Sequence, residues 1–330
     1  MHALFYDLSD SWSPVFIDDS DCHTLMVHRI DAPDELQISM KPISRVEADA
    51  YFNVKLIRLI GATDQFLTDS VEWSDENQEL IIKARTPEAL MDRLICDRRG
   101  TQENGEAVKA VTGLAKAVIP AAVPLTVVDP KDYSKTNVQG YDADSKDLLS
   151  ASSEILKESR FFWWRVRMVS PDPLKFEVYV VDQRRDGKVL ASDIDGSISL
   201  VSKKTDYSKL ATRVRGKTTF QENNENRDVY EWVGDSNKGF LFREHNVSVD
   251  SAEGWNRSQA VKAARSSANG AIRRNPHSIE IRVNLDEPHP IGTVLNAVIA
   301  GTGLDYVVME TRIEENEGRT IEETLEQLEG

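Results

Sequence analysis

The chain has 330 residues, 40% of them hydrophobic and 29% charged, so it is long enough for two or three domains with real cores and is not compositionally disordered. Its formal net charge of -15 argues against general nucleic-acid binding, which needs Lys and Arg to neutralise phosphates. The same charge suits a surface along which a polyanion slides, although solubility alone explains it equally well.

The sequence offers no sign of secretion or of a membrane span. Cys22 and Cys96 are too few for a disulfide framework, and buried thiols in a reducing compartment are expected. The first ten residues contain two acidic residues and no Lys or Arg, unlike the basic start of a secretory signal. No run approaches the ~20 apolar residues that cross a bilayer. We therefore expect a protein made and folded in a cytoplasm.

Residues 1–85 are predicted to be rich in strands. Two sets of apolar residues recur at a period of two, namely Phe52, Val54, Leu56 and Ile60, and then Leu80, Ile82 and Ala84. Such alternation indicates strands with one buried and one solvated face, as in antiparallel sheets. Turn-forming clusters at 18–21 and 73–77 separate the runs.

A first helix is predicted to follow directly. Thr86 can cap it, Pro87 suits the first helical position, and Glu88 favours the positive end of the helix dipole. Apolar residues at helical spacing follow, and the helix should end near 98–100, where two arginines precede a glycine.

Two more helices and a short strand are predicted before residue 160. The helices span about 104–119 and 146–159, each with an apolar stripe at helical spacing. Pro120 ends the first of them, and a short strand over 125–128 lies between the two.

The clearest hairpin is predicted over residues 162–180. Alternating residues in 162–168 and 174–180 form its strands, and Ser-Pro-Asp-Pro at 170–173 has the composition of a turn. Trp163 and Trp164 are adjacent, so their rings are expected on opposite faces, with one of the two buried. Core packing is the simplest role for the pair.

Beyond residue 185 strands return, with one helix among them. A strand is predicted over 213–220, an exposed polar loop over 221–228, and a helix over about 255–274. The inner stripe of the helix is small, and its outer face is basic: Val261, Ala264, Ala268 and Ile272 against Lys262, Arg265, Arg273 and Arg274. This basic cluster is either a solvated helix face or a contact for the acidic surface of a partner.

The end of the chain is predicted as strands over 279–285 and 307–313, followed by a helix. Thr320 and Glu323 form a capping-box pattern, and the apolar residues after Thr320 have helical spacing: Ile321, Leu325 and Leu328. Strands grouped at both ends with helices between them indicate an α+β fold and not a doubly wound parallel one.

A search for chemistry finds no candidate catalytic, cofactor-binding or metal-binding residue, and no cofactor is expected. His23 and His28 are five apart, which in a strand puts them on opposite faces. Asp193-Ile194-Asp195-Gly196 begins like a calcium loop, but the twelfth position is Lys204, so a turn is predicted. Gly301-Thr302-Gly303 lacks the rest of a dinucleotide fingerprint and is also predicted to be a turn.

The order of elements, more than any motif, resembles a known family. The segments that show it are Gln78–Arg85 followed by Leu94 and Arg98-Arg99, the helix from Lys146 into Phe161–Val166 and Phe176–Tyr179, Ser197–Leu200 with Thr205–Leu210 and Thr212–Gly216, and the ending Ile291–Val294, Asp305–Ile313 and Glu317-Gly318. In these the chain resembles the baseplate or tail hub proteins of tailed phages and related injection systems, above all the short hubs of long non-contractile tails. A member of that family would end in a strand, where this sequence has helical spacing.

The resemblance implies a homotrimeric structural hub that closes the distal end of a tail tube and is not an enzyme. Each subunit would contain two tube-like β-barrel domains, so that three subunits adapt a sixfold tube to a threefold tip. Residues 1–85 and 186–330 are the candidates for these domains, the second with its helix near 255–274. Residues 86–185 would then be a peripheral insert of helices and a hairpin.

The resemblance also implies partners and a location. The partners would be the tail tube or distal tail protein, a tip fibre or spike protein and the tape-measure protein. DNA would pass through an acidic lumen without specific binding, because like charges repel. The protein would be assembled in the host cytoplasm and reside at the tail tip of the virion.

Two alternatives remain from the residues. A wall-degrading enzyme of the same particle would need a cleft with a perturbed carboxylate or a metal. A carbohydrate- or receptor-binding module would need exposed aromatic rings, for which the candidates are Trp163, Trp164, Trp232 and Trp255.

Overall fold

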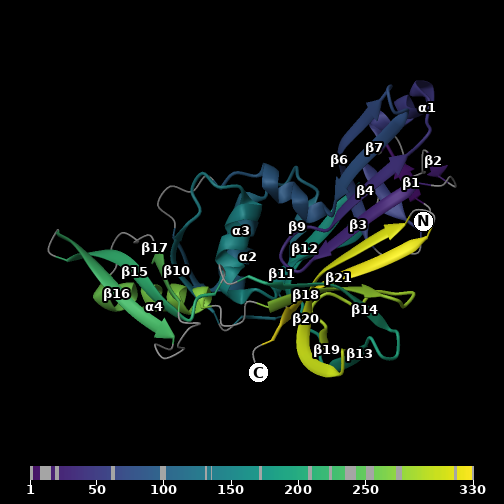
Figure 1. The fold of residues 1–330 in the computed structure, drawn as a ribbon. Coiled ribbons are helices and arrows are strands. Elements are labelled where there is room, and N and C mark those ends of the chain that lie inside the picture. The colour runs from purple at the N-terminus through teal and green to yellow at the C-terminus, as the bar shows by residue number, and fades with distance from the viewer. Residues whose placement is uncertain are drawn as a thin grey trace.

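The computed structural model describes residues 3–7, 16–18, 22–60, 64–96, 102–130, 132–134, 136–170, 173–206, 210–222, 225–234, 243–249, 256–272, 277–315 and 318–328. Strands dominate this part of the chain, and helices lie between runs of strands (Figure 1). The α+β class predicted from the sequence is confirmed.

Thirteen of the described strands form one sheet. The first third of the chain supplies β1 (Ala3–Tyr6), β2 (Phe16–Asp18), β3 (His23–Arg29), β4 (Glu35–Met40), β5 (Leu56–Leu59), β6 (Gln65–Ser74) and β7 (Glu79–Arg85). The last part supplies β13 (Lys188–Ser192), β14 (Ile198–Thr205), β18 (His277–Val283), β19 (Val294–Ile299), β20 (Thr302–Glu315) and β21 (Arg319–Gln327). Their order is β14-β18-β21-β20-β3-β4-β7-β6-β5-β1-β2, while β19 pairs with β20 and β13.

β20 joins the two ends of the chain within this sheet. It has 14 residues and pairs antiparallel with β21 from Tyr306 onward. Its first half also pairs with β19, and its second half, Glu310 to Glu315, pairs antiparallel with β3. Ile313 and Met26 are direct partners in this register, and both are buried. Strands from opposite ends of the chain are therefore immediate neighbours.

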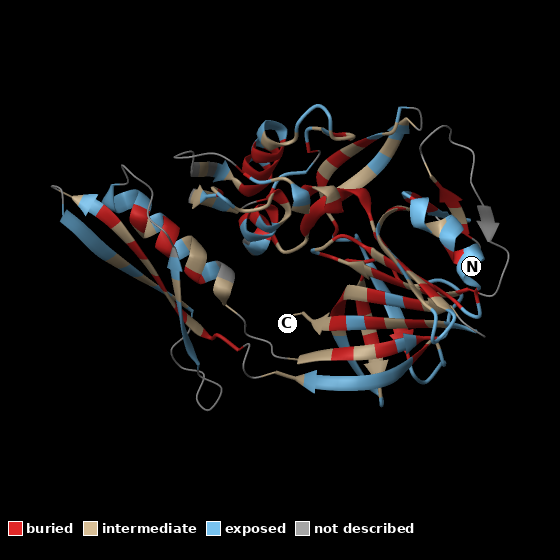
Figure 2. Ribbon diagram, turned by 90° about the horizontal axis from the view of Figure 1, so that it is seen from above, coloured by how far each residue is buried: buried red, intermediate tan, exposed pale blue. Residues whose placement is uncertain are grey.

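One hydrophobic core lies against this sheet. Inward side chains of both strand groups build it, such as Ile38 and Ile82 from the first group and Ile281 and Leu325 from the second. Buried and exposed residues alternate along these strands (Figure 2). The period-two predictions over 80–84 and 279–283 are thus confirmed.

The middle of the chain forms a second core. Helices α2 (Ala107–Val118) and α3 (Leu148–Leu156) share it with the sheet of β11 (Phe162–Ser170), β12 (Lys175–Asp182) and β9 (Leu125–Val127), and β8 (Gln102–Glu106) pairs with β10 (Asn137–Asp142). The predicted hairpin and short strand are confirmed. Trp163 and Trp164 are both buried, because side chains on both faces of β11 belong to the core, so the expectation of only one buried ring is wrong. Cys22 and Cys96 are buried and form no disulfide, as predicted.

The first two helices predicted in the middle region differ from their predictions for local reasons. The segment after Thr86 starts at Pro87 as predicted, but it is a 3₁₀ helix, η2 (Pro87–Arg93). It ends before Leu94, which is extended, so the prediction of a helix to about 98–100 is wrong. The Thr86 hydroxyl does not cap it, because it accepts a hydrogen bond from the Asp34 amide at 3.0 Å. α2 begins at Ala107 and not near 104, because the preceding residues pair as β8 and Glu106 caps the helix.

The extended segment predicted over 52–60 is only partly correct. Leu56–Leu59 is β5, but α1 (Arg45–Asp49) and the 3₁₀ helix η1 (Ala50–Asn53) precede it. Ser44 and Glu47 form a capping box that starts α1, and Phe52 is consequently exposed in η1.

The polar stretch 221–228, predicted to be a loop, is largely paired strand. β15 (Arg213–Glu222) and β16 (Glu225–Gly234) continue their antiparallel ladder through it. Its polar side chains find partners across the strands: Asp228 accepts a hydrogen bond from Thr219 at 2.7 Å and lies 2.8 Å from the Lys217 ammonium. Polar composition therefore did not prevent strand pairing.

The predicted C-terminal helix is wrong, because residues 319–327 form β21. The i to i+4 spacing of Ile321 and Leu325 fits one face of a strand as well as one face of a helix. Glu323 lies on the same inward face, fully buried, where it accepts hydrogen bonds from the His289 amide at 2.7 Å and contacts Nδ1 of that ring at 3.0 Å. Because a carboxylate occupies one of the inward positions, the apolar residues alone do not show the period-two alternation of a strand.

Residues 210–272 include a smaller sheet and its helix, which lie to one side of the other elements (Figure 1, Figure 2). β15 is the central strand, antiparallel to β16 and parallel to β17 (Glu244–Val249). α4 (Arg257–Ala271) covers one face, so the predicted helix is confirmed. Its buried stripe is small, as predicted, but consists of Ala260, Ala263, Ala264 and Ala268: Ala264 and Ala268 are predicted members, whereas Val261 is half-buried and Ile272 follows the helix end. Lys262 and Arg265 are exposed, and the other two predicted basic residues, Arg273 and Arg274, lie outside the described residues.

We predict that Gly216→Ala forces α4 away from β15. A Cβ at this position would lie 1.9 Å from the carbonyl oxygen of Ala264. Overpacking against backbone should cost about 1–3 kcal/mol, measured as faster hydrogen exchange of the α4 amides.

The matched control is Gly113→Ala in α2, where the added Cβ meets no atom within 4 Å. Helix propensity predicts a gain of about 1 kcal/mol there. Unchanged α4 exchange in Gly216→Ala would contradict the close approach of helix and sheet.

Candidate functional site

The described residues contain no arrangement of three or more His, Cys, Asp or Glu side chains that could hold a metal ion. His23 lies 2.9 Å from Glu314, and His28 lies 2.9 Å from Asp34, so the two histidines contact different carboxylates. Residues 193–196 form the predicted turn. The turn predicted at 301–303 falls at Ala300-Gly301, both with positive φ, and β20 starts directly after it.

One end of the large sheet has an apolar, unpaired edge. Among the described strands, β14 pairs only with β18 and β13 only with β19. Large apolar side chains are exposed on these two strands and the turn between them: Val189, Leu190, Ile194, Leu200 and Val201. Leu190 is 66% exposed and Ile194 is 76% exposed. An exposed apolar edge of this kind is typical of a surface that another chain covers.

The opposite end of the sheet also exposes apolar side chains. β2 is its last strand, paired with β1; β1 also pairs with β5, and Tyr51 of η1, which follows α1, packs edge-on against Phe5 of β1. Val46 on α1 is 82% exposed, and Phe52 and Ile60 are about half exposed. Both ends of one continuous sheet are therefore candidate assembly surfaces.

The polar face of the sheet has charges of both signs in cross-strand pairs. On β3, Arg29 lies 2.7 Å from Glu35 and 3.2 Å from Glu310. Further along the same face, Arg282 lies 3.0 Å from Glu322. Exposed pairs of this kind contribute roughly 0–1 kcal/mol each, so they define register more than stability. This face is not uniformly acidic.

The tryptophans considered for sugar binding differ in exposure. Trp163 and Trp164 are buried, Trp255 lies outside the described residues, and Trp232 on β16 is 40% exposed. Guanidinium groups already stack on the exposed ring: that of Arg213 lies 4.3 Å and that of Arg215 lies 5.6 Å from its centre. The ring therefore has cationic partners within its own sheet.

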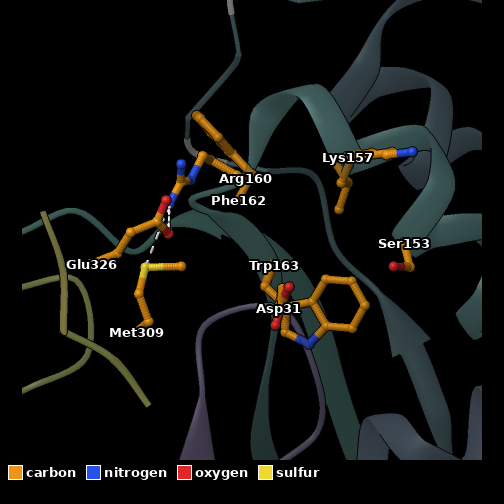
Figure 3. A pocket seen from close by; sticks show the side chains of 9 residues that line it. Asp31, Ser153, Lys157, Arg160, Phe162, Trp163, Met309 and Glu326 are labelled. Atoms are coloured by element: carbon orange, nitrogen blue, oxygen red, sulfur yellow. Dashed lines mark hydrogen bonds and ion pairs between the residues drawn. The ribbon is translucent and has the colours of Figure 1, made fainter. Parts of the chain in front are cut away.

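A small cavity separates α3 and η3 (Lys157–Ser159) from the last strands of the sheet. Its volume is about 220 Å³, and Arg160, Trp163 and Glu326 are among the residues that line it. Arg160 donates a hydrogen bond to Glu326 of β21 and contacts the sulfur of Met309 (Figure 3). This pair ties the middle of the chain to its last strand.

A buried cluster of ionisable groups joins β3, η2 and β11. Asp34 is almost fully buried; it contacts Nδ1 of His28 and accepts a hydrogen bond from the amide of Arg29 at 3.1 Å. Arg165 of β11 lies 3.7 Å from the same carboxylate and donates a hydrogen bond to Gln183. Asp34 thus links the first strand group to the middle of the chain.

Three groups in this cluster have displaced pKa values. Burial, with a further contribution from the Asp34 charge, raises the pKa of Glu88 to about 8. Burial and the Asp34 charge also raise the pKa of Asp64. Burial alone would lower the pKa of His28, but its hydrogen bond and attraction to Asp34 outweigh burial and raise it.

Sequence reasoning missed this cluster. The sequence pattern places Glu88 at the positive end of a helix and does not single out Asp34 or Arg165. No periodicity relates residues so far apart in the chain, since the cluster exists only where the hairpin packs on the first strands. A buried acid directly after Thr-Pro is the one local signal, and it also fits a helix start.

No protein-family model and no curated protein matches the sequence. Solved structures do. The 43 kDa tail protein of prophage MuSo2 from Shewanella oneidensis has a TM-score of 0.58 at 12% identity, over 99% of this chain and 98% of that one. The tail protein from Neisseria meningitidis MC58 has a TM-score of 0.60 at 14% identity, over 99% and 95%. Prophage tail protein gp18 from Listeria monocytogenes EGD-e has a TM-score of 0.55 at 10% identity, over 100% and 96%.

The chain has the fold of prophage tail proteins. At these identities the likeness shows the fold, and it covers at least 95% of each of the three neighbours. The resemblance stated from the sequence is thereby confirmed as a resemblance of fold. In this tail-protein fold, no described helix is long and apolar enough to cross a membrane.

We predict that Glu88→Gln removes part of the pH dependence of stability of the tail-protein fold. The folded chain keeps a proton on Glu88 up to about pH 8, while the unfolded chain releases it near the ordinary pKa of 4.5. The folded state binds more protons in this window, so the free energy of unfolding falls as pH rises through it. The variant should therefore gain on the order of 2–4 kcal/mol over the wild type between pH 4.5 and 8.

Urea unfolding at pH 4.5 and pH 8 measures this difference. Glu72→Gln, which changes an exposed carboxylate on β6, is the control and should follow the wild type. Parallel pH profiles for the wild type and Glu88→Gln would contradict the burial of an acid at this position.

Proposed function

We propose that this chain is a structural subunit of a phage-type tail, and that within the tail it is the hub closing the distal end of the tube. The fold shared with three prophage tail proteins supports a tail role. The continuous sheet supports the hub role most strongly. Its strand groups from the two ends of the chain are adjacent across β3 and β20, and its outer ends expose apolar side chains.

Three copies in a ring would cover both outer ends. The β13–β14 end of one copy would meet the α1, β5 and β2 end of the next. Such a heterologous contact forms a closed ring when the rotation from copy to copy brings the third copy back to the first. Each copy would supply two sectors, residues 1–85 and residues 186–330. Six sectors would match a sixfold tube, and three copies would match a threefold tip. Residues 86–185 would form the peripheral insert, with the β15–β17 and α4 unit beside it.

In the virion, this ring would lie at the tail tip after assembly in the host cytoplasm. It would contact the tail tube or distal tail protein on one side and a tip fibre or spike protein on the other. The tape-measure protein and DNA would pass through its lumen. The cross-strand ion pairs on the polar face support passage without adhesion, since Arg29 and Arg282 are already paired with carboxylates and offer phosphates no free row of cations.

We predict that the purified chain forms a trimer and that Leu190→Glu prevents it. Leu190 is exposed at the proposed contact, so the substitution leaves the subunit folded but places a charge where apolar surface would be buried. Multi-angle light scattering should give three times the mass of one chain for the wild type. The variant should give the mass of one chain at the same concentration.

Val169→Glu is the matched control. Val169 is an exposed apolar residue, like Leu190, but it lies on β11 in the middle region, away from the proposed contact. It should remain trimeric. A wild type that is monomeric at every concentration, or a Leu190→Glu variant that stays trimeric, would contradict the proposed ring contact.

A further inference from the structure

A cavity of about 350 Å³ lies where η2 meets β11 and β12, and two of its lining residues have a buried side-chain oxygen without a hydrogen-bond partner. Glu88 is 2% exposed, and its Oε2 atom has no hydrogen-bond partner. The Oε1 atom of Gln65 is also buried without a partner, and it lines the same cavity. A buried acceptor without a hydrogen-bond partner is unfavourable. The Gln65 oxygen, and the Glu88 carboxylate once it is ionised, can both accept from a donor placed in the cavity.

The cavity is lined by three acidic residues and by two arginines whose guanidinium groups already have other partners. Asp34 and Asp64 line it together with Glu88, and His28 lies behind Asp34. The two arginines among its described lining residues already have partners. Arg165 donates to Gln183 and lies near Asp34, and Arg167 of β11 donates to Glu177 of β12.

We infer that this cavity binds a single guanidinium or primary ammonium group, presented by a basic side chain of a partner protein or by a free amine. Such groups are pure donors, which complement acceptors without donors. A guanidinium can also stack on an aromatic ring, and Phe176 and Tyr179 line the cavity. The volume lies within the range of sites for small ligands. The site is independent of the ring contact proposed above.

Binding exchanges a proton for the cation. In the empty site the Glu88 carboxyl keeps its proton near neutral pH, since burial and the Asp34 charge disfavour the carboxylate. A cation beside Oε2 reverses that balance: the O–H bond of Glu88 breaks, its proton passes to solvent, and the carboxylate pairs with the ligand. The charges of Asp34 and Arg165 act on the Glu88 carboxyl directly, and His28 and Asp64 act on Asp34.

The location suggests what an occupant does. The cavity is bounded by Asp64 and Gln65 from the first strand group and by Arg165 and Phe176 from the hairpin of the middle region. A bound cation would therefore bridge these two parts of the chain. A basic side chain from a neighbouring tail protein would fix their relative position when that neighbour docks.

Isothermal titration of the full chain with agmatine at pH 7 tests the inference, in two buffers that differ in protonation enthalpy. We expect saturable binding with release of about one proton per site. Glu88→Gln keeps the shape of the side chain but not the titratable group, and it should bind at least about tenfold more weakly without proton release. Glu72→Gln should behave like the wild type.

The two sources of the cation are separated by a second probe, N-acetyl-arginine amide. Binding of this probe as tight as that of agmatine supports a side chain of a partner protein, and binding of agmatine alone supports a free amine. Absence of saturable binding for both probes, or equal binding and proton release in Glu88→Gln, would overturn the site. Repeating the titration on Leu190→Glu separates this result from the fate of the ring proposal.

Discussion

The antiparallel ladder between β3 and β20 is the constraint on which the rest of the structure depends. It brings residues 24–29 beside residues 310–315, so one sheet and one core are built from both ends of the chain. Without this ladder, each strand group would have an additional open edge. With it, most of the large exposed apolar side chains that the described strands of this sheet carry lie toward its two outer ends, near Leu190 and near Val46, while Leu304 of β20 is exposed as well. The assembly proposal follows from that distribution.

Polar contacts hold the middle region to this sheet. The Asp34 carboxylate contacts the His28 ring, the Arg29 amide and the Arg165 guanidinium. Arg160 donates a hydrogen bond to Glu326 on the last strand. Such contacts are strong where they are buried and complete, and costly where a member lacks a partner. Glu88 is the member whose carboxyl has an oxygen without a partner. The pH dependence of stability and the binding of the proposed ligand therefore both depend on whether Glu88 is protonated. The same residue thus connects the fold to a site that the hub role does not require.

Strands with regular alternation were predictable from the sequence, and so were α4 and the hairpin of 162–180. Ile279, Ile281 and Val283 bury one face of a strand because only apolar residues occupy it. The last strand was not predictable, since Glu323 interrupts the apolar face and its partner His289 is 34 residues away. The pairing of Thr219 with Asp228 likewise became visible only in the hairpin. The cluster around Glu88 depends on contacts between distant segments, which no local period encodes.

The central claim is that the two outer ends of the sheet meet between copies of the chain. Lysine cross-linking of a refolded mixture of ¹⁴N- and ¹⁵N-labelled protein tests it most directly, because links between copies join peptides of different isotope. We expect mixed-isotope links from Lys203 or Lys204 on β14 to Lys55, which directly precedes β5 toward the other end of the sheet. Links between these lysines found only within one isotope, or mixed-isotope links only elsewhere on the chain, would contradict the account.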